Sequence, residues 1–174
     1  MKTNTKILVL RYLLWAAVLA VMIIIFIFSS KTAEQSSNSS GSFAKTLLSA
    51  VVPGFTEFSE EKQQAAVDSM QFIVRKGAHF AVFLTLGALC QLAMSTYNIK
   101  LKRRVISALS ISLVYAISDE VHQTFVPGRA GQVRDVLIDF AGALTGVALA
   151  CLLVWLCFKI RSKRGMNFEK KSAD

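Results

Sequence analysis

Residues 12–28 read Tyr12-Leu-Leu-Trp-Ala-Ala-Val-Leu-Ala-Val-Met-Ile-Ile-Ile-Phe-Ile-Phe28, a run of 17 without a polar interruption. A helix needs about 20 mostly apolar residues to cross a bilayer. Residues 7–10 and a snorkelling Arg11 extend the run to that length. We therefore expect a first membrane span over residues 7–28. A cleaved signal peptide is the alternative, but its apolar region would be shorter, and no small-x-small cleavage site follows.

Three further apolar runs lie at about residues 77–97, 104–123 and 135–158. The run at 104–123 reaches spanning length only if the helix continues through Asp119 to Gln123. With 53% hydrophobic residues among 174, the chain is too apolar for an ordinary soluble domain of this size. The sequence thus predicts an all-α integral membrane protein, with residues 1–174 forming one domain that has four transmembrane helices.

The segment between the first two spans, residues 29–76, is long enough to hold structure of its own. Its Ser-rich start, residues 36–42, is typical of a flexible linker. Helical spacing of the apolar residues between Phe43 and Val52 predicts a short helix lying at the membrane interface. Pro53-Gly54 then predicts a turn, and Ser59 is a candidate N-cap for a helix leading into the second span.

Basic residues predict the orientation of the spans. Residues 1–11 carry three Lys or Arg, residues 98–104 carry four, and the tail 159–174 carries six, which places thirteen on one side and seven on the other. Because cytoplasmic segments are enriched in Lys and Arg, both termini are expected in the cytoplasm, and residues 29–76 on the other side of the membrane.

The net charge of +9 does not point to nucleic acid, because the basic residues flank apolar spans, where they meet anionic lipid head groups. No nucleic-acid motif is found, and membrane lipids are the expected partners. The three cysteines, Cys90, Cys151 and Cys157, lie inside apolar runs and are expected to be inert buried thiols.

Ionisable residues gather in three segments that this topology brings to one face of the membrane. One group lies at the start of the second span, one at the end of the third span, and one in the following loop and at the start of the fourth span. The residues are Arg75, Lys76 and His79, then Asp119, Glu120, His122 and Gln123, then Arg129, Arg134, Asp135 and Asp139. Charges at membrane depth are costly and persist mainly with partners and for a function. The sequence therefore predicts a polar pocket there.

Helical spacing predicts which of these residues share a face. Asp119, His122 and Gln123 follow i, i+3, i+4, with Glu120 offset by about 100°. Asp135 and Asp139 continue into Gly142 and Gly146, a GxxxG pattern that lets a second helix approach closely. That helix could belong to the same chain or to a second copy in a homo-oligomer.

Residue chemistry suggests roles within the pocket. The catalytic candidates are His79, Asp119 and Glu120; the ligand-binding candidates are Arg75, Lys76, His122, Gln123, Arg129, Arg134, Asp135 and Asp139. Arginine suits phosphate or carboxylate groups, and Asp119 with a histidine suits a base–orienter pair. Asp135 and Asp139 are expected to orient the arginines. A metal site from His79, His122, Asp119 and Asp135 is conceivable, but no strong metal-binding spacing is present, so no metal or cofactor is expected. Whether the protein is an enzyme stays open.

Four motifs together resemble the VanZ-like family. They are Phe28-Ser29-Ser30, Arg75-Lys76-Gly77-Ala78-His79-Phe80, Asp119-Glu120-Val121-His122-Gln123 through Pro127-Gly128-Arg129, and Val133-Arg134-Asp135 through Asp139. Lys31 stands where the family often has Gln. The resemblance implies a small bacterial membrane protein whose namesake is associated with low-level resistance to the lipoglycopeptide teicoplanin, and it implies no defined reaction.

These observations lead to one functional hypothesis and one alternative. The hypothesis is an outer-leaflet pocket that recognises or modifies an envelope lipid, a lipid-linked cell-envelope precursor or a lipoglycopeptide, with lower teicoplanin susceptibility as one consequence. The alternative is a structural or accessory membrane protein in which the charged cluster is an ion-pair network that fastens the helices, since such networks also gather ionisable groups.

Overall fold

The computed structural model describes residues 5–171, and the side chains of residues 5–160. Its helices are α1 (Thr5–Ser29), α2 (Ala33–Val51), the 3₁₀ helix η1 (Phe55–Glu57), α3 (Glu60–Ser95), α4 (Leu101–Gln123) and α5 (Val133–Lys171). Four of them, α1, α3, α4 and α5, are long and apolar enough to cross a membrane. The all-α membrane fold expected from the sequence is therefore confirmed. Lys2, and the side chains of the basic tail beyond Ile160, lie outside the described residues.

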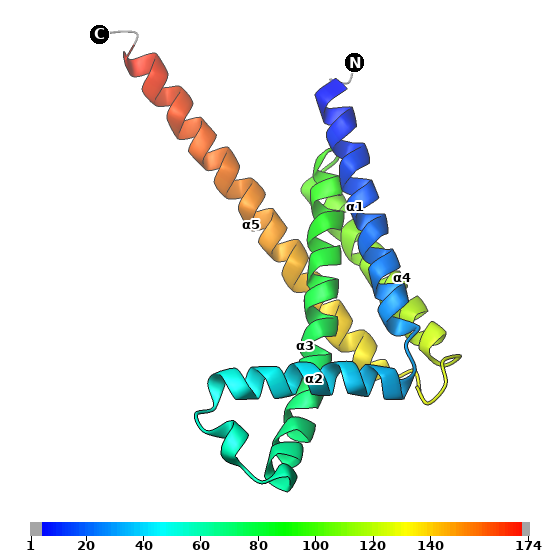
Figure 1. The fold of residues 1–174 in the computed structure, drawn as a ribbon. Coiled ribbons are helices and arrows are strands. Elements are labelled where there is room, and N and C mark those ends of the chain that lie inside the picture. The colour runs from blue at the N-terminus through cyan, green and yellow to red at the C-terminus, as the bar shows by residue number, and fades with distance from the viewer. Residues whose placement is uncertain (1–4, 172–174) are drawn as a thin grey trace.

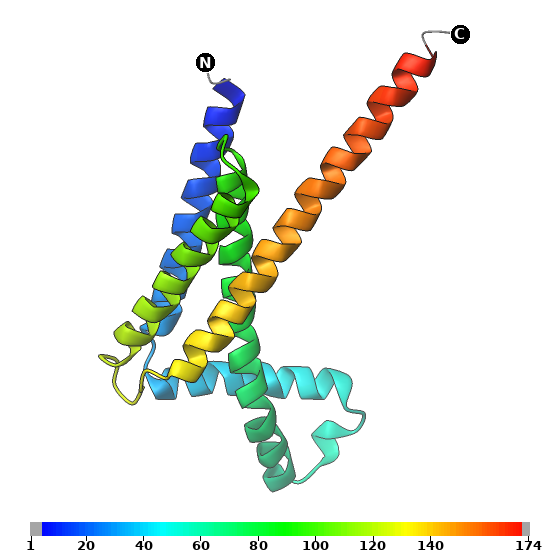
Figure 2. The same cartoon turned by 180° about the vertical axis from the view of Figure 1, so that it is seen from behind.

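Helix α3 is the centre of the fold, because it contacts α1, α2, α4 and α5. The start of α1, the α3–α4 connection and the end of α5 lie at one end of the bundle (Figure 1). At the other end lie α2, the start of α3 and the α4–α5 loop; we call this the α2 end. Viewed from behind, α5 diverges from the other helices toward its C-terminus (Figure 2).

Glycines allow α3 and α5 to pack backbone against backbone. A Cβ added at Gly142 would collide with the Phe80 carbonyl oxygen, and one at Gly146 with that of Leu84. From the opposite helix, Gly87 fits against the backbone of Ala143. The GxxxG pattern thus serves packing within the chain, and a homo-oligomer contact through Gly142 and Gly146 would need a surface that α3 already covers.

The helices bury narrow faces and leave apolar surface outside. The main core includes Val18 and Ile25 of α1, Phe83 and Leu86 of α3, and Val147 of α5. The outward faces of α1 and α5 remain apolar, as expected for helices surrounded by lipid.

The Ser-rich segment is helical, so the prediction of a flexible linker there is wrong. Thr32 caps α2: its Oγ1 accepts a hydrogen bond from the Gln35 backbone N–H, and its own backbone N–H donates to Gln35 Oε1, which forms a capping box. The Oγ atoms of Ser39 and Ser40 bond to carbonyls one turn earlier, which satisfies these side chains inside a helix.

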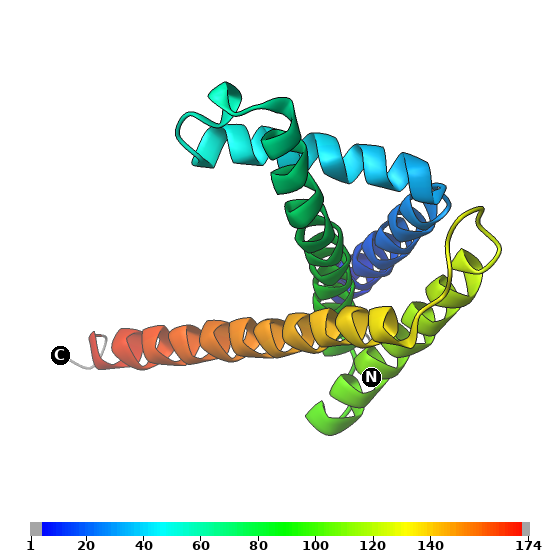
Figure 3. The same ribbon diagram turned by 90° about the horizontal axis from the view of Figure 1, so that it is seen from below.

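Helix α2 lies across α3 at the α2 end of the bundle (Figure 3). It buries Ala44 and Leu48 in a small cluster with Phe55 and Val67, so this helix is longer and better packed than its sequence suggested. Helix α3 starts at Glu60 and runs without a break to Ser95, so the expected lead-in helix and the second span are one element. Ser59 is its N-cap, without a side-chain capping bond.

Candidate functional site

Asp119 of α4 links its helix to α1 at the α2 end through a hydrogen bond. Its side chain is buried, and its Oδ2 accepts hydrogen bonds from Ser29 Oγ at 2.9 Å and from Gln123 Nε2 at 3.0 Å. Both partners are buried as well, so the carboxylate is held in one orientation. The last residue of α1 therefore supports the polar end of α4.

Gln123 links Asp119 to two further groups. Its Nε2 also donates to Glu120 Oε1 at 3.0 Å, and its Oε1 accepts from Arg129 Nη1 at 3.0 Å. The other Glu120 oxygen accepts from the Gln132 backbone at 2.8 Å. Glu120, a catalytic candidate from the sequence, is thus bonded through both oxygens to residues that shape the α4–α5 loop.

His122 is less buried than Asp119, Glu120 and Gln123, its neighbours in α4. Its Nε2 is 3.1 Å from Ser30 Oγ, and the centre of its ring is 4.6 Å from the centre of the Phe26 ring. The spacing argument placed His122 with Asp119 and Gln123 and Glu120 at an offset. Asp119 and His122 both bond to the end of α1, at Ser29 and Ser30. Glu120 is buried as well, because the α4–α5 loop covers its side of the final turn of α4.

A tight turn holds Arg129, as expected. Pro127 precedes Gly128, whose φ of 73° is typical of a type II turn, and the Arg129 amide donates to the Val126 carbonyl at 3.1 Å. The Pro127 carbonyl in turn accepts from Ala33, at the start of α2. The turn therefore connects the α4–α5 loop to α2.

The charge pairing differs from the expected one. Lys76 Nζ lies 2.6 Å from an Asp135 oxygen, and His79 Nδ1 lies 3.4 Å from Asp139 Oδ1. Neither of these ion pairs contains an arginine, so Asp135 and Asp139 do not orient the arginines. Arg134 is exposed, with its guanidinium 5.5 Å from the ring centre of Phe72.

His79, Asp119 and Asp139 meet although they come from α3, α4 and α5. One ligand atom from each lies within 4.8 Å of the other two. The metal set considered from the sequence is thus changed, because His122 and Asp135 are not in this cluster and Asp139 is. The base–orienter arrangement also changes, since Asp139 is the closest carboxylate to the His79 ring nitrogen.

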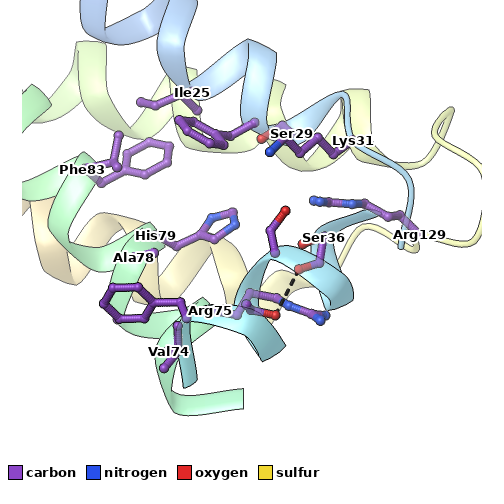
Figure 4. Close-up of a pocket in the computed structure, with 16 residues that line it drawn as sticks. Ile25, Ser29, Lys31, Ser36, Val74, Arg75, Ala78, His79, Phe83 and Arg129 are labelled. Carbon is purple, nitrogen blue, oxygen red and sulfur yellow. Dashed lines mark hydrogen bonds between the residues drawn. The ribbon is translucent and has the colours of Figure 1, made fainter. Parts of the chain in front are cut away.

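A cavity of about 570 Å³ lies between α1, α2, α3 and the Arg129 turn. Its polar lining is Lys31, Arg75, His79, Arg129 and serines, with no carboxylate, and its apolar lining includes Ile25, Phe28, Phe43, Val82 and Phe83. The His79 ring points into the cavity, and Arg129 reaches toward it from the loop (Figure 4). Lys76, Arg134 and Asp135 are not part of its wall.

Two arginines in this wall are close enough to affect each other. Burial lowers the pKa of Arg129, and the positive charge of Arg75 lowers it further, while Asp119 and Glu120 oppose this effect. Arg129 still carries its charge at neutral pH, because an arginine pKa starts far above 7. Arg75 donates from Nη2 to Ser37 Oγ at 2.9 Å, and its buried Nε has no partner among the described residues.

The VanZ/LLP1 family matches residues 14–155, which contain every residue of this site. The chain belongs to the VanZ/LLP1 family. The resemblance noted in the sequence motifs is therefore confirmed. Neither the curated proteins nor the solved structures contain a match to this VanZ/LLP1 chain.

The sequence interpretation missed the contribution of α1 and α2 to the site of this VanZ/LLP1 protein. Ser29 and Ser30 bond to Asp119 and His122, Ser37 bonds to Arg75, and Lys31 lines the cavity. A signal was present, because two serines end an otherwise apolar span. Their partners, about 90 residues later in the chain, could not be read from local spacing.

Proposed function

We propose that this membrane protein binds the anionic head group of an envelope lipid in the cavity between α1, α2 and α3. The observation that carries the proposal is the composition of the cavity wall, which has three cationic side chains, a histidine and no carboxylate. Guanidinium groups bind phosphate through strong, charge-assisted hydrogen bonds. The unpartnered Nε of Arg75 is a donor that such a group would satisfy.

The apolar wall supports a ligand that also has acyl chains. Phe28 and Phe43 line the cavity and are 56% and 60% exposed. The apolar side of the cavity therefore continues onto surface that lipid chains would cover. A head group among the cations and chains along this surface would match both halves of an anionic amphiphile.

The separation of charges favours this proposal over a helix-fastening network. In such a network arginines and carboxylates would pair, since an unpaired buried charge is strongly destabilising. Here Arg75 and Arg129 bond to uncharged Ser37 and Gln123, while Asp119 and Glu120 bond to Gln123 as well. The guanidinium groups thus retain their charge for a ligand.

Removing a cavity cation is expected to weaken binding of an anionic lipid. Arg75→Gln should raise the Kd for fluorescent phosphatidylglycerol at least tenfold, because a charge-assisted hydrogen bond contributes about 1.5–3 kcal/mol. The measurement is a titration of the detergent-purified protein, with phosphatidylcholine as the neutral competitor.

Arg134→Gln is the matched control for this titration, because it removes the same charge from an exposed side chain outside the cavity. Its Kd should stay within about twofold of the wild type, as expected for a weakly contributing surface charge. Equal weakening in both variants, or equal affinity for both lipids, would show that general surface charge and not the cavity binds the lipid.

We further propose that the α2 end faces outward from a bacterial plasma membrane, with both termini in the cytoplasm. The support is the basic-residue bias of the connections, including residues 98–104 at the opposite end. Placed this way, the cavity lies at the outer leaflet, where lipid-linked cell-envelope precursors and lipoglycopeptides are found. Teicoplanin is a lipoglycopeptide and carries a lipid chain, so its capture in the cavity would lower teicoplanin susceptibility.

A cysteine at Asn38, exposed on α2, should react with a membrane-impermeant thiol reagent in intact cells. A cysteine at Lys102, exposed at the start of α4, should react only after permeabilisation. Wild type sets the background, since Cys157 is exposed on α5. The reverse labelling pattern would place the cavity at the cytoplasmic face and reject the outer-leaflet proposal.

A further inference from the structure

The cluster of His79, Asp119 and Asp139 adjoins the cavity at His79 and differs from it chemically, because it contains two carboxylates and the cavity wall contains none. Three different helices supply one residue each, and their ligand atoms lie within 4.8 Å of one another. In a metal site with bonds of about 2.0–2.2 Å, neighbouring ligand atoms are roughly 3–3.5 Å apart. The contact between His79 Nδ1 and Asp139 Oδ1, at 3.4 Å, already has this separation.

Asp139 is an unpartnered buried carboxylate aimed into this cluster. Its exposed fraction is 0%, and neither of its oxygens has a hydrogen-bond partner in the described part of the chain. Buried carboxylates in proteins are normally hydrogen-bonded, paired or coordinated to a metal. The His79 contact at 3.4 Å leaves most of this requirement unmet.

The surrounding cations are engaged elsewhere. Lys76 bonds to both oxygens of Asp135, and Arg129 bonds to Gln123. Across the described residues, no Lys or Arg nitrogen lies within 4.0 Å of an oxygen of Asp119 or Asp139. Two buried carboxylates therefore share a single imidazole, a charge arrangement that a divalent cation would balance.

Asp119 is already oriented as a ligand would be. Its Oδ2 accepts from Ser29 and Gln123, whereas no described residue donates a hydrogen bond to Oδ1. Outer hydrogen bonds of this kind fix the orientation of ligating carboxylates in metal sites.

We propose that His79, Asp119 and Asp139 bind a divalent first-row transition metal ion. One imidazole nitrogen and two carboxylate oxygens suit Zn²⁺ or Mn²⁺ better than Ca²⁺ or Mg²⁺, which prefer all-oxygen ligands. Closing the site requires the most distant ligand atoms to approach by up to about 1.3–1.8 Å, the difference between 4.8 Å and the separations in a metal site. His79 also lines the cavity, so open coordination positions would be accessible from there. Metal binding does not depend on the proposed lipid binding.

The test is Mn²⁺ binding to the full-length protein, purified in lipid-free detergent without a polyhistidine tag and stripped with a chelator. Electron paramagnetic resonance of free Mn²⁺ should show about one ion bound per wild-type chain. Asp139→Asn should weaken binding at least tenfold. Asp135→Asn, one turn earlier in α5 and paired with Lys76, should bind Mn²⁺ as the wild type does.

A second measurement keeps the inference testable if Asp139→Asn fails to fold. The wild-type complex should show electron spin echo modulation from one histidine nitrogen, and His79→Gln should remove it. Absence of Mn²⁺ and Zn²⁺ binding by the wild type, no nitrogen coupling, or equal binding by folded Asp139→Asn would overturn the metal site. A shared proton between Asp139 and its neighbours would then account for the buried carboxylates. Since no lipid is present, failure here leaves the lipid-binding test unaffected.

Discussion

Gly146→Leu is expected to destabilise the protein by about 3 kcal/mol or more, because overpacking typically costs 1–3 kcal/mol and here the clash involves backbone. Even the first added atom, a Cβ, would overlap the carbonyl oxygen of Leu84. A main-chain atom inside helix α3 cannot move aside as a flexible side chain can. The substitution must therefore separate α3 from α5, which also separates His79 from Asp139.

The measurement is thermal or SDS-induced unfolding of the purified protein in detergent, together with its abundance in membranes. Ala141→Leu is the control, because it makes a similar enlargement on an exposed face of the same helix. It should change the free energy of unfolding by no more than about 0.5 kcal/mol. Similar losses for both variants would mean that close approach of α3 and α5 does not hold the fold together.

Gln123→Leu is the second substitution expected to have a large effect. The Gln123 side chain is only 5% exposed and bonds to Asp119, Glu120 and Arg129. Leucine fills a comparable volume but offers no donor or acceptor. Each buried group left without its partner is destabilising by about 1–3 kcal/mol, so the total loss should reach roughly 3 kcal/mol or more.

His122→Leu, at the neighbouring position, is the control for this variant. His122 is half-buried and makes one side-chain hydrogen bond, to Ser30. Its substitution should cost about 1 kcal/mol. Unfolding in detergent measures both variants, and a Gln123→Leu protein as stable as His122→Leu would contradict the central role assigned to Gln123.

The α2 end of the bundle therefore contains two chemically different regions that meet at His79. On the cavity side lie Lys31, Arg75 and Arg129, which suit an anionic ligand. Behind the imidazole lie Asp119 and Asp139, which suit a cation. An anion in front and a metal ion behind would lie on opposite sides of one imidazole.

The sequence by itself determined the features that depend on local chemistry. Length and continuity of apolar runs are sufficient for the four spans, because a bilayer requires about 20 such residues. The Val126–Arg129 turn could be predicted from Pro and Gly, and the grouping of ionisable residues at one end followed from the order of the spans. The Ser-rich helix was missed because its capping box depends on Thr32 and Gln35, while composition alone favoured a linker.

Only the tertiary structure decided how the polar residues pair. Helical spacing gives the face of a residue but neither the rotation of each helix nor its depth against its neighbours. Those depend on contacts such as Gly142 and Gly146 against α3, which set the distance between helices. For this reason Asp139 could be predicted as a site residue but not as a neighbour of His79 and Asp119. The same packing decides the partners of the charged groups. It places Arg75 beside Ser37 and Arg129 beside Gln123, and neither arginine bonds to a carboxylate.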